Sequence, residues 1–199
     1  MPAKLVTVIA ALALLVTGGL PAVGQEEDGG PPPESAVGRY VPPATALGAG
    51  WVVVQASDPQ PNPALFREGA KVAYGGPAGA RAVLFAWVLA DGATQADAWA
   101  AAGQLGERYR AAFAADIAGV QLDPAAPPPP GCAQAVRAEG RDPASEFSAG
   151  VTLCAVGGEA IVFAVVSGDL GVEHGAAASD RLVGLALAGV TGSEATPAP

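Results

Sequence analysis

Three residues of the types found in serine hydrolases lie close together near the carboxyl end of the sequence. Ser167, Asp169 and His174 supply a hydroxyl, an acid and a base within eight residues. A catalytic triad is assembled in space from separate parts of a fold, and the sequence has no G-x-S-x-G motif for an exposed nucleophile. We therefore interpret Asp169 as a helix cap and His174 as an exposed residue of the first helical turn. No catalytic residue is predicted.

Three carboxylates form a second candidate for acid–base chemistry. Glu139, Asp142 and Glu146 are interspersed with Arg137 and Arg141. Glycosidase-type catalysis needs two acids held close together beside the scissile bond. The neighbouring arginines and the polar surroundings predict a solvated, charged loop instead.

A glycine-rich stretch, residues 75–79, follows an apolar run in the way that phosphate-binding loops follow a strand. It lacks the Gly-Lys-Ser or Gly-Lys-Thr ending, and the next apolar run predicts a strand, so no helix N-terminus is available for phosphate. We interpret residues 75–79 as a hairpin connection. Asn62 precedes Pro63 and is therefore no glycosylation acceptor.

The two cysteines, Cys132 and Cys154, are predicted to form a disulfide. Disulfides persist in oxidising compartments, and the amino terminus indicates export, as described below. With a single histidine and no C-x-x-C pair, a structural zinc site lacks ligands. We predict neither a metal nor a cofactor.

The first half of the chain predicts three strands and a helix. The strands are expected at residues 51–56, 70–74 and 81–90, the last being apolar on both faces and therefore central in a sheet. Thr94 is a suitable N-cap with Asp97 three residues later, an acidic variant of the capping box. Apolar residues then recur at helical spacing: Trp99, Ala102, Leu105, Tyr109, Phe113 and Ile117.

The second half repeats this order. Strands are expected at residues 132–139, 147–156 and 159–166, and a helix at 172–188, while Gly157-Gly158 predicts a tight hairpin turn. The predicted fold is α+β, an antiparallel sheet with two helices packed on one face. The repeated order suggests a duplicated strand-strand-strand-helix unit.

The aromatic residues at strand and helix spacing are expected to belong to the core rather than to a cofactor site. They are Phe85, Trp87, Trp99, Tyr109 and Phe163. Spacings of two on a strand and about four on a helix are those of elements that pack on each other.

The amino terminus has the layout of a secretory signal. Lys4 precedes an apolar run at residues 5–16, and small residues follow, with Ala22 and Gly24 placed for cleavage before Gln25. The run is shorter than the ~20 residues of a permanent span, although an uncleaved anchor is the alternative. We predict a signal peptide at 1–24, a disordered acidic leader at 25–45, one globular domain at 46–190 and a disordered tail at 191–199.

The acidic composition argues against nucleic acid as a partner. The chain carries 10 basic and 19 acidic side chains, a formal net charge of −9. Nucleic-acid binding depends on clustered lysine and arginine, and here only Lys71 would remain as a lysine after the signal is removed. No membrane span is expected after cleavage.

These features predict an exported, non-enzymatic binding or sensor domain. Residues 161–166 are apolar on both faces, so a sheet with helices on one face only needs a cover on the other. Loops, a second copy of the chain in a homodimer, or a small apolar ligand could supply it. The alternatives are a structural or interaction protein of the cell envelope and a secreted enzyme with a scattered site.

Overall fold

The computed structural model describes residues 35–59, 62–116, 121–122, 127–142, 147–170 and 175–193. The predictions for the signal peptide, the leader before residue 35 and the tail after residue 193 lie outside these residues. So do those for Ile117, Glu146 and His174.

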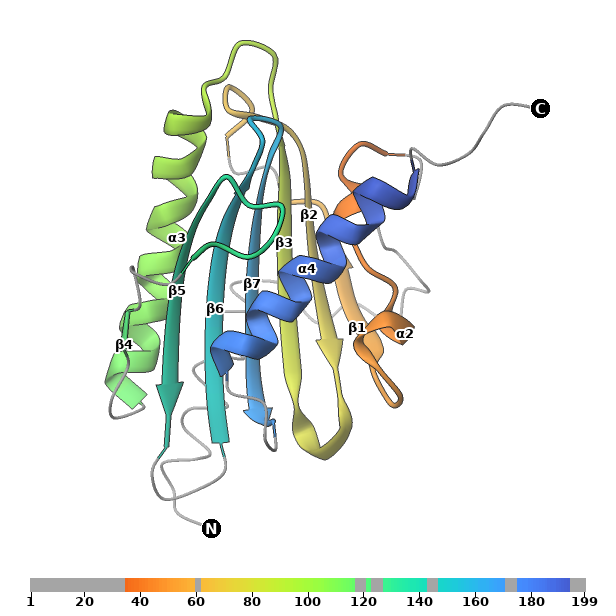
Figure 1. Cartoon of the computed structure of the whole chain (residues 1–199), viewed down its shortest axis with the longest axis vertical. Helices are drawn as coiled ribbons and strands as arrows, with labels where there is room; N and C mark the ends of the chain where they lie inside the picture. The colour runs from red at the N-terminus through yellow and green to blue at the C-terminus, as the bar shows by residue number, and fades with distance from the viewer. Residues whose placement is uncertain are drawn as a thin grey trace, which may run out of the picture.

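The fold is α+β with an open antiparallel sheet, as predicted (Figure 1). The strand order is β1-β2-β3-β7-β6-β5-β4, and every neighbouring pair is antiparallel. The strands are β1 (Val52–Ser57), β2 (Phe66–Gly75), β3 (Arg81–Leu89), β4 (Gln121–Leu122), β5 (Gln134–Arg141), β6 (Phe147–Val156) and β7 (Ala160–Asp169). The helices are α2 (Ala44–Leu47), α3 (Gln95–Asp116) and α4 (Gly175–Ser193), with 3-10 turns η1 (Gly38–Tyr40) and η2 (Pro77–Gly79). None of the described helices has the length and apolar character that a membrane span requires.

Both predicted hairpins are confirmed. Gly157 and Gly158 have φ angles of 47° and 81°, and the Glu159 N–H donates to the Val156 carbonyl at 2.8 Å. Two consecutive positive φ angles make this a type I′ turn, whose twist matches that of the flanking strands. Residues 75–79 connect β2 to β3, with the Gly76 N–H donating to the Ala80 carbonyl at 2.7 Å.

Helix α3 begins as its cap predicts. The Thr94 hydroxyl accepts the Asp97 N–H at 3.2 Å and donates to the Asp97 carboxylate at 2.6 Å. Ala102 is buried, and Trp99 and Leu105 pack against the same cluster while partly exposed. The side chains of Tyr109 and Phe113 lie outside the description.

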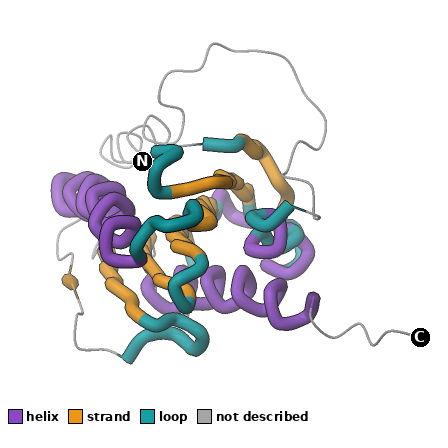
Figure 2. The backbone as a smooth tube through the Cα atoms, turned by 90° about the horizontal axis from the view of Figure 1, so that it is seen from above, coloured by secondary structure: helices purple, strands orange, loops and turns teal. Residues whose placement is uncertain are grey.

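The two helices cover opposite faces of the sheet, so the prediction that both pack on one face is wrong (Figure 2). Helix α3 packs on the face that carries Phe85, Trp87 and Phe163, and α4 packs on the face that carries Leu84 and Val162. Strands β3 and β7 are apolar on both sides, so each face has to be covered. The apolar residues on both faces of β3 and β7 indicated that each face needs a cover, but they did not indicate which helix covers which face.

The strand order is symmetrical about the β3–β7 pair, but the helices do not follow that symmetry. A two-fold axis relating neighbouring antiparallel strands stands perpendicular to the sheet, and it would place equivalent helices on the same face. Because α3 and α4 lie on opposite faces, the structure does not support a duplicated unit that includes the helix.

Residues 35–45 belong to the folded domain, which corrects their assignment to a disordered leader. Tyr40 is fully buried, and Val37 and Leu47 are buried beside it on the α4 side of the sheet. The Tyr74 hydroxyl donates to the Pro42 carbonyl at 2.8 Å. This segment covers part of the sheet face next to α4, which explains why its apolar residues are ordered despite the surrounding prolines. At the other end, α4 continues to Ser193, past the predicted domain end at residue 190.

The predicted aromatic core is confirmed for the three strand residues. Phe85, Trp87 and Phe163 are buried on the α3 side, with ring centroids 5.4 Å apart for Phe85–Trp87 and 5.9 Å for Phe85–Phe163. Trp99 packs against this cluster from α3 while remaining partly exposed.

Candidate functional site

The serine-hydrolase candidates do not form a described site. Ser167 and Asp169 both lie in β7, and His174 is outside the described residues. The strand extends to Asp169, and α4 begins only at Gly175, so the interpretation of Asp169 as a helix cap is wrong.

The carboxylates around residue 140 are not arranged as a solvated loop. Arg137, Glu139 and Arg141 are all part of β5, and Asp142 directly follows it. The Asp142 N–H donates to the Phe147 carbonyl at 3.1 Å, which continues the pairing with β6 beyond the strand end. Regular pairing with β6 therefore extends the strand further than its charged sequence suggested.

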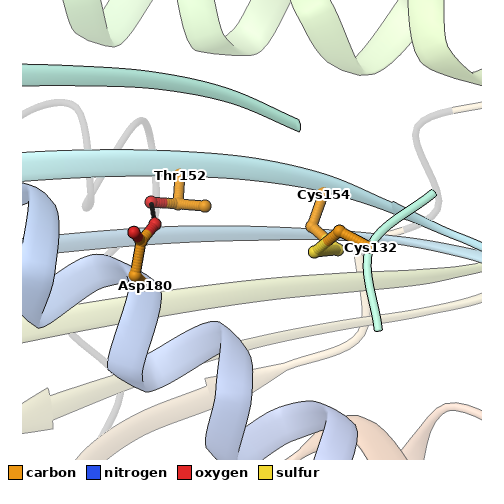
Figure 3. Close-up of a disulfide and its surroundings, with 4 residues drawn as sticks. All are labelled: Cys132, Thr152, Cys154 and Asp180. Atoms are coloured by element: carbon orange, nitrogen blue, oxygen red, sulfur yellow. Dashed lines mark hydrogen bonds between the residues drawn. A yellow bond between two sulfur atoms is a disulfide. The ribbon is translucent and has the colours of Figure 1, made fainter. Parts of the chain in front are cut away.

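A polar network ties α4 to β5 and β6. The Arg137 guanidinium contacts the Asp180 carboxylate at 2.8 Å. The Thr152 hydroxyl donates to the other Asp180 oxygen at 2.7 Å, as Figure 3 shows. The Thr152 and Ser179 hydroxyls are 2.8 Å apart, and the Ser179 hydroxyl donates to the Ala176 carbonyl. Because these groups are mutually satisfied, the network is suited to positioning the helix rather than to catalysis.

We predict that Asp180→Ala lowers the free energy of unfolding by about 2 kcal/mol, because it leaves Arg137 and Thr152 without their shared acceptor. Arg137 and Asp180 retain 16% and 24% side-chain exposure, which keeps the loss below that of a fully buried pair. Urea denaturation of the wild type and the variant measures this decrease in the free energy of unfolding. Asp91→Ala is the control, because Asp91 is fully exposed and 3.6 Å from Arg67. Equal midpoints for the two variants would contradict a structural role for the network.

The predicted disulfide is present between Cys132 and Cys154 (Figure 3). Their Cα atoms are 5.5 Å apart, within the range that a disulfide bridges. Cys154 is fully buried in β6 on the α4 side, and the Ala133 N–H donates to the Ala155 carbonyl at 2.8 Å. The bond therefore fastens the segment entering β5 to the neighbouring strand, as expected. The described residues contain no group of three potential metal ligands among His, Cys, Asp and Glu.

A cavity opens on the α3 side of the sheet. Helix α3 packs over β5, β6 and β7, and no helix among the described residues covers the other half of this face. There the structure has a cavity of about 470 Å³, which we call the sheet cavity. Its main apolar lining consists of Val54, Ala73, Val83 and Val165.

The register of β2 explains why this space exists. Ala73 pairs with Val83, which pairs with Val165, and in the next row Gly75 pairs with Arg81. Alternate residues of a strand share a face, so two small residues, Ala73 and Gly75, occupy neighbouring positions in the lining of the cavity. Larger residues there would fill the volume.

The edge strand β1 forms one wall. A β-bulge interrupts its pairing with β2 between Val53 and Gln55, and a Cβ atom on Gly75 would lie 3.1 Å from Val54 Cγ1. Val52, Val53 and Val54 are exposed on this edge. The polar lining side chains are Gln55, Arg81 and Ser167.

A second cavity of about 470 Å³ lies between α3 and the opposite end of β2 and β3. It is lined by Asn62, Phe66, Trp87, Ala101, Ala102, Gln104, Leu105 and Arg108. The Trp87 Nε1 atom is buried without an acceptor among the described residues, so it is not accessible to a molecule in that space. The polar groups there are exposed ones on the loop and the helix, whereas the sheet cavity rests on paired strands.

Burial shifts the pKa of three described groups. Desolvation raises the pKa of the Tyr74 and Tyr40 phenols and lowers the pKa of the Lys71 ammonium. Tyr74 hydrogen-bonds to the Pro42 carbonyl, and the Lys71 Nζ lies 5.7 Å from the Phe85 ring centroid. Both tyrosines stay protonated at neutral pH, where they act as packing and hydrogen-bonding groups.

Comparison of the sequence with protein-family models and with curated proteins found no match. The function is therefore argued from the site. Sequence reasoning did not single out the sheet cavity, because its lining comes from β1, β2, β3 and β7, which are brought together only by the register. The available signal was the pair of small residues, Ala73 and Gly75, at alternate positions near the end of β2.

Proposed function

We propose that this protein is an exported, non-enzymatic domain that binds a small apolar molecule in the sheet cavity. The observation that carries the proposal is an open, mainly aliphatic cavity of about 470 Å³ on paired strands of the sheet. Small-molecule sites typically have volumes of about 300–1,000 Å³ and apolar walls with a few polar groups. The sheet cavity has both properties.

The lining favours binding over catalysis. Its apolar side chains are valine and alanine, and its polar side chains are Gln55, Arg81 and Ser167. Burying an aliphatic ligand here removes apolar surface from water, at about 25 cal/mol per Å². Strands β2, β3 and β7, each paired on both sides, hold most of the lining in place, so little ordering of these strands is needed on binding.

Export is supported by the disulfide and by the secretory layout of the first 24 residues. A buried disulfide that fastens two segments of the fold requires an oxidising compartment to form and persist. A cavity that faces such a compartment would sample molecules outside the cytoplasm.

The exposed edge of β1 favours a second candidate, an interaction protein of the cell envelope. Val52, Val53 and Val54 are 57%, 43% and 63% exposed. An apolar edge strand can pair with another chain, but the bulge before Gln55 interrupts its regular hydrogen bonding. We therefore place this candidate second.

Titration with phenylnaphthylamine, a neutral fluorophore that brightens in apolar surroundings, tests the first proposal. We predict that Ala73→Phe, which fills the cavity, weakens binding by at least about tenfold. The control is Ala177→Phe, which adds the same ring at an exposed position of α4 on the opposite side of the sheet. It should bind like the wild type.

Two results would overturn the proposal. One is a wild-type protein that does not brighten the fluorophore. The other is an Ala73→Phe variant that binds as the wild type does while its circular dichroism spectrum shows a folded domain.

A further inference from the structure

Arg81 is the one charged residue in the described lining of the sheet cavity. It is the first residue of β3, and it pairs with Gly75 of β2 and Ser167 of β7. Arg81 and Val83 share a face of the strand because they are two residues apart. Its side chain therefore starts in the row next to Ala73, Val83 and Val165, beside Val83.

No acidic side chain in the described parts of the chain pairs with the Arg81 guanidinium. Three other arginines have such partners: Arg39 pairs with Glu159, Arg67 with Asp91 and Arg137 with Asp180. In a chain with a net charge of −9, an unpaired arginine beside an apolar cavity leaves a cation available to a ligand.

We infer that the ligand is an anionic amphiphile, with an aliphatic body over Ala73, Val83 and Val165 and a carboxylate at Arg81. This inference rests on the proposed function. A guanidinium presents two parallel N–H donors that match a carboxylate. The Ser167 hydroxyl, in the neighbouring position of β7, is placed to donate to the same head group.

The positive charge of Arg81 should favour an anionic ligand over a neutral one. An anion gains both the local cation and the apolar contact in this cavity. A neutral molecule of the same length gains the apolar contact alone. The carboxylate should therefore bind more tightly than its neutral counterpart, and added salt should reduce the difference because Arg81 is exposed.

The experiment compares dodecanoate with dodecanol as competitors of phenylnaphthylamine. We expect the wild type to bind dodecanoate about tenfold more tightly than dodecanol. Arg81→Gln should abolish this preference, so that dodecanoate and dodecanol compete with equal affinity. Arg67→Gln, which removes the same charge from a site where arginine pairs with Asp91, should keep the preference.

A preference for dodecanoate that survives in Arg81→Gln would overturn this inference, as would equal wild-type affinities for the two competitors. In either case, fluorophore binding that is lost in Ala73→Phe would leave the proposed function intact. Absence of fluorophore binding in the wild type would remove both.

Discussion

Replacing Trp87 with alanine is expected to lower the free energy of unfolding by about 3–5 kcal/mol, the range observed for large aromatic residues in cores. Trp87 is 4% exposed, stacks on Phe85 and lies 5.8 Å from Phe66 between ring centroids. The alanine variant loses these contacts and leaves a cavity under α3. A loss of this size would unfold much of a domain of ordinary stability.

Urea denaturation followed by circular dichroism gives the value, with Trp87→Phe as the matched variant. Phenylalanine keeps most of the apolar contact and removes an indole N–H that has no acceptor among the described residues. The free energy of unfolding should therefore fall by less than half as much in Trp87→Phe as in Trp87→Ala. Trp99→Ala should also cost less, because Trp99 is partly exposed. A Trp87→Ala variant as stable as the wild type would contradict the assigned core.

Removing the disulfide with the double substitution Cys132→Ala and Cys154→Ala is expected to cost about 3 kcal/mol, as the chain-entropy model gives for a loop of this length. The bond joins residues separated by 22 positions. Most of the effect arises in the unfolded chain, which the bond restricts. The folded protein keeps the β5–β6 pairing that places Ala135 opposite Cys154.

Two denaturant midpoints, that of the double variant and that of the wild type in reducing buffer, distinguish the contribution of the cross-link from that of sulfur packing. Both midpoints should fall by similar amounts relative to the oxidised wild type. If the double variant is destabilised while reduction leaves the wild type unchanged, the stabilisation comes from packing of Cys154, and the cross-link contributes nothing.

Local signals predicted the turns and every strand except β4, although β2 begins at Phe66 rather than at residue 70. The Gly157-Gly158 pair between apolar runs identified the β6–β7 hairpin, and Thr94 with Asp97 identified the start of α3. The disulfide also followed from composition and compartment. Each of these features depends on neighbouring residues or on cysteine chemistry, which a single sequence contains.

Features that depend on three-dimensional placement were missed. The alternation in β3 and β7 showed two buried faces, but it could not assign α3 and α4 to them. Tyr40 lies among prolines whose composition suggested a leader, yet its ring is buried on the α4 side of the sheet. Asp180 was unremarked in the sequence, and its role depends on contacts with Arg137 and Thr152 on other elements.

The candidate site was beyond sequence reasoning for the same reason. A cavity requires small residues on one strand to lie beside a gap in the helical cover, and both conditions arise from register and helix placement. The sequence predicted a helix-free sheet face that needs a cover, with loops, a second copy of the chain or a small apolar ligand as the alternatives. Among the described residues, the area without a helix lies beside α3, over β1 to β3.

A crystal structure of the protein with dodecanoate tests the sheet cavity as the binding site most directly. We predict an aliphatic chain over Ala73 and Val83, with the carboxylate within hydrogen-bond distance of the Arg81 guanidinium. Dodecanoate bound instead in the second cavity beside Trp87 and Leu105, or along the exposed edge of β1, would contradict it.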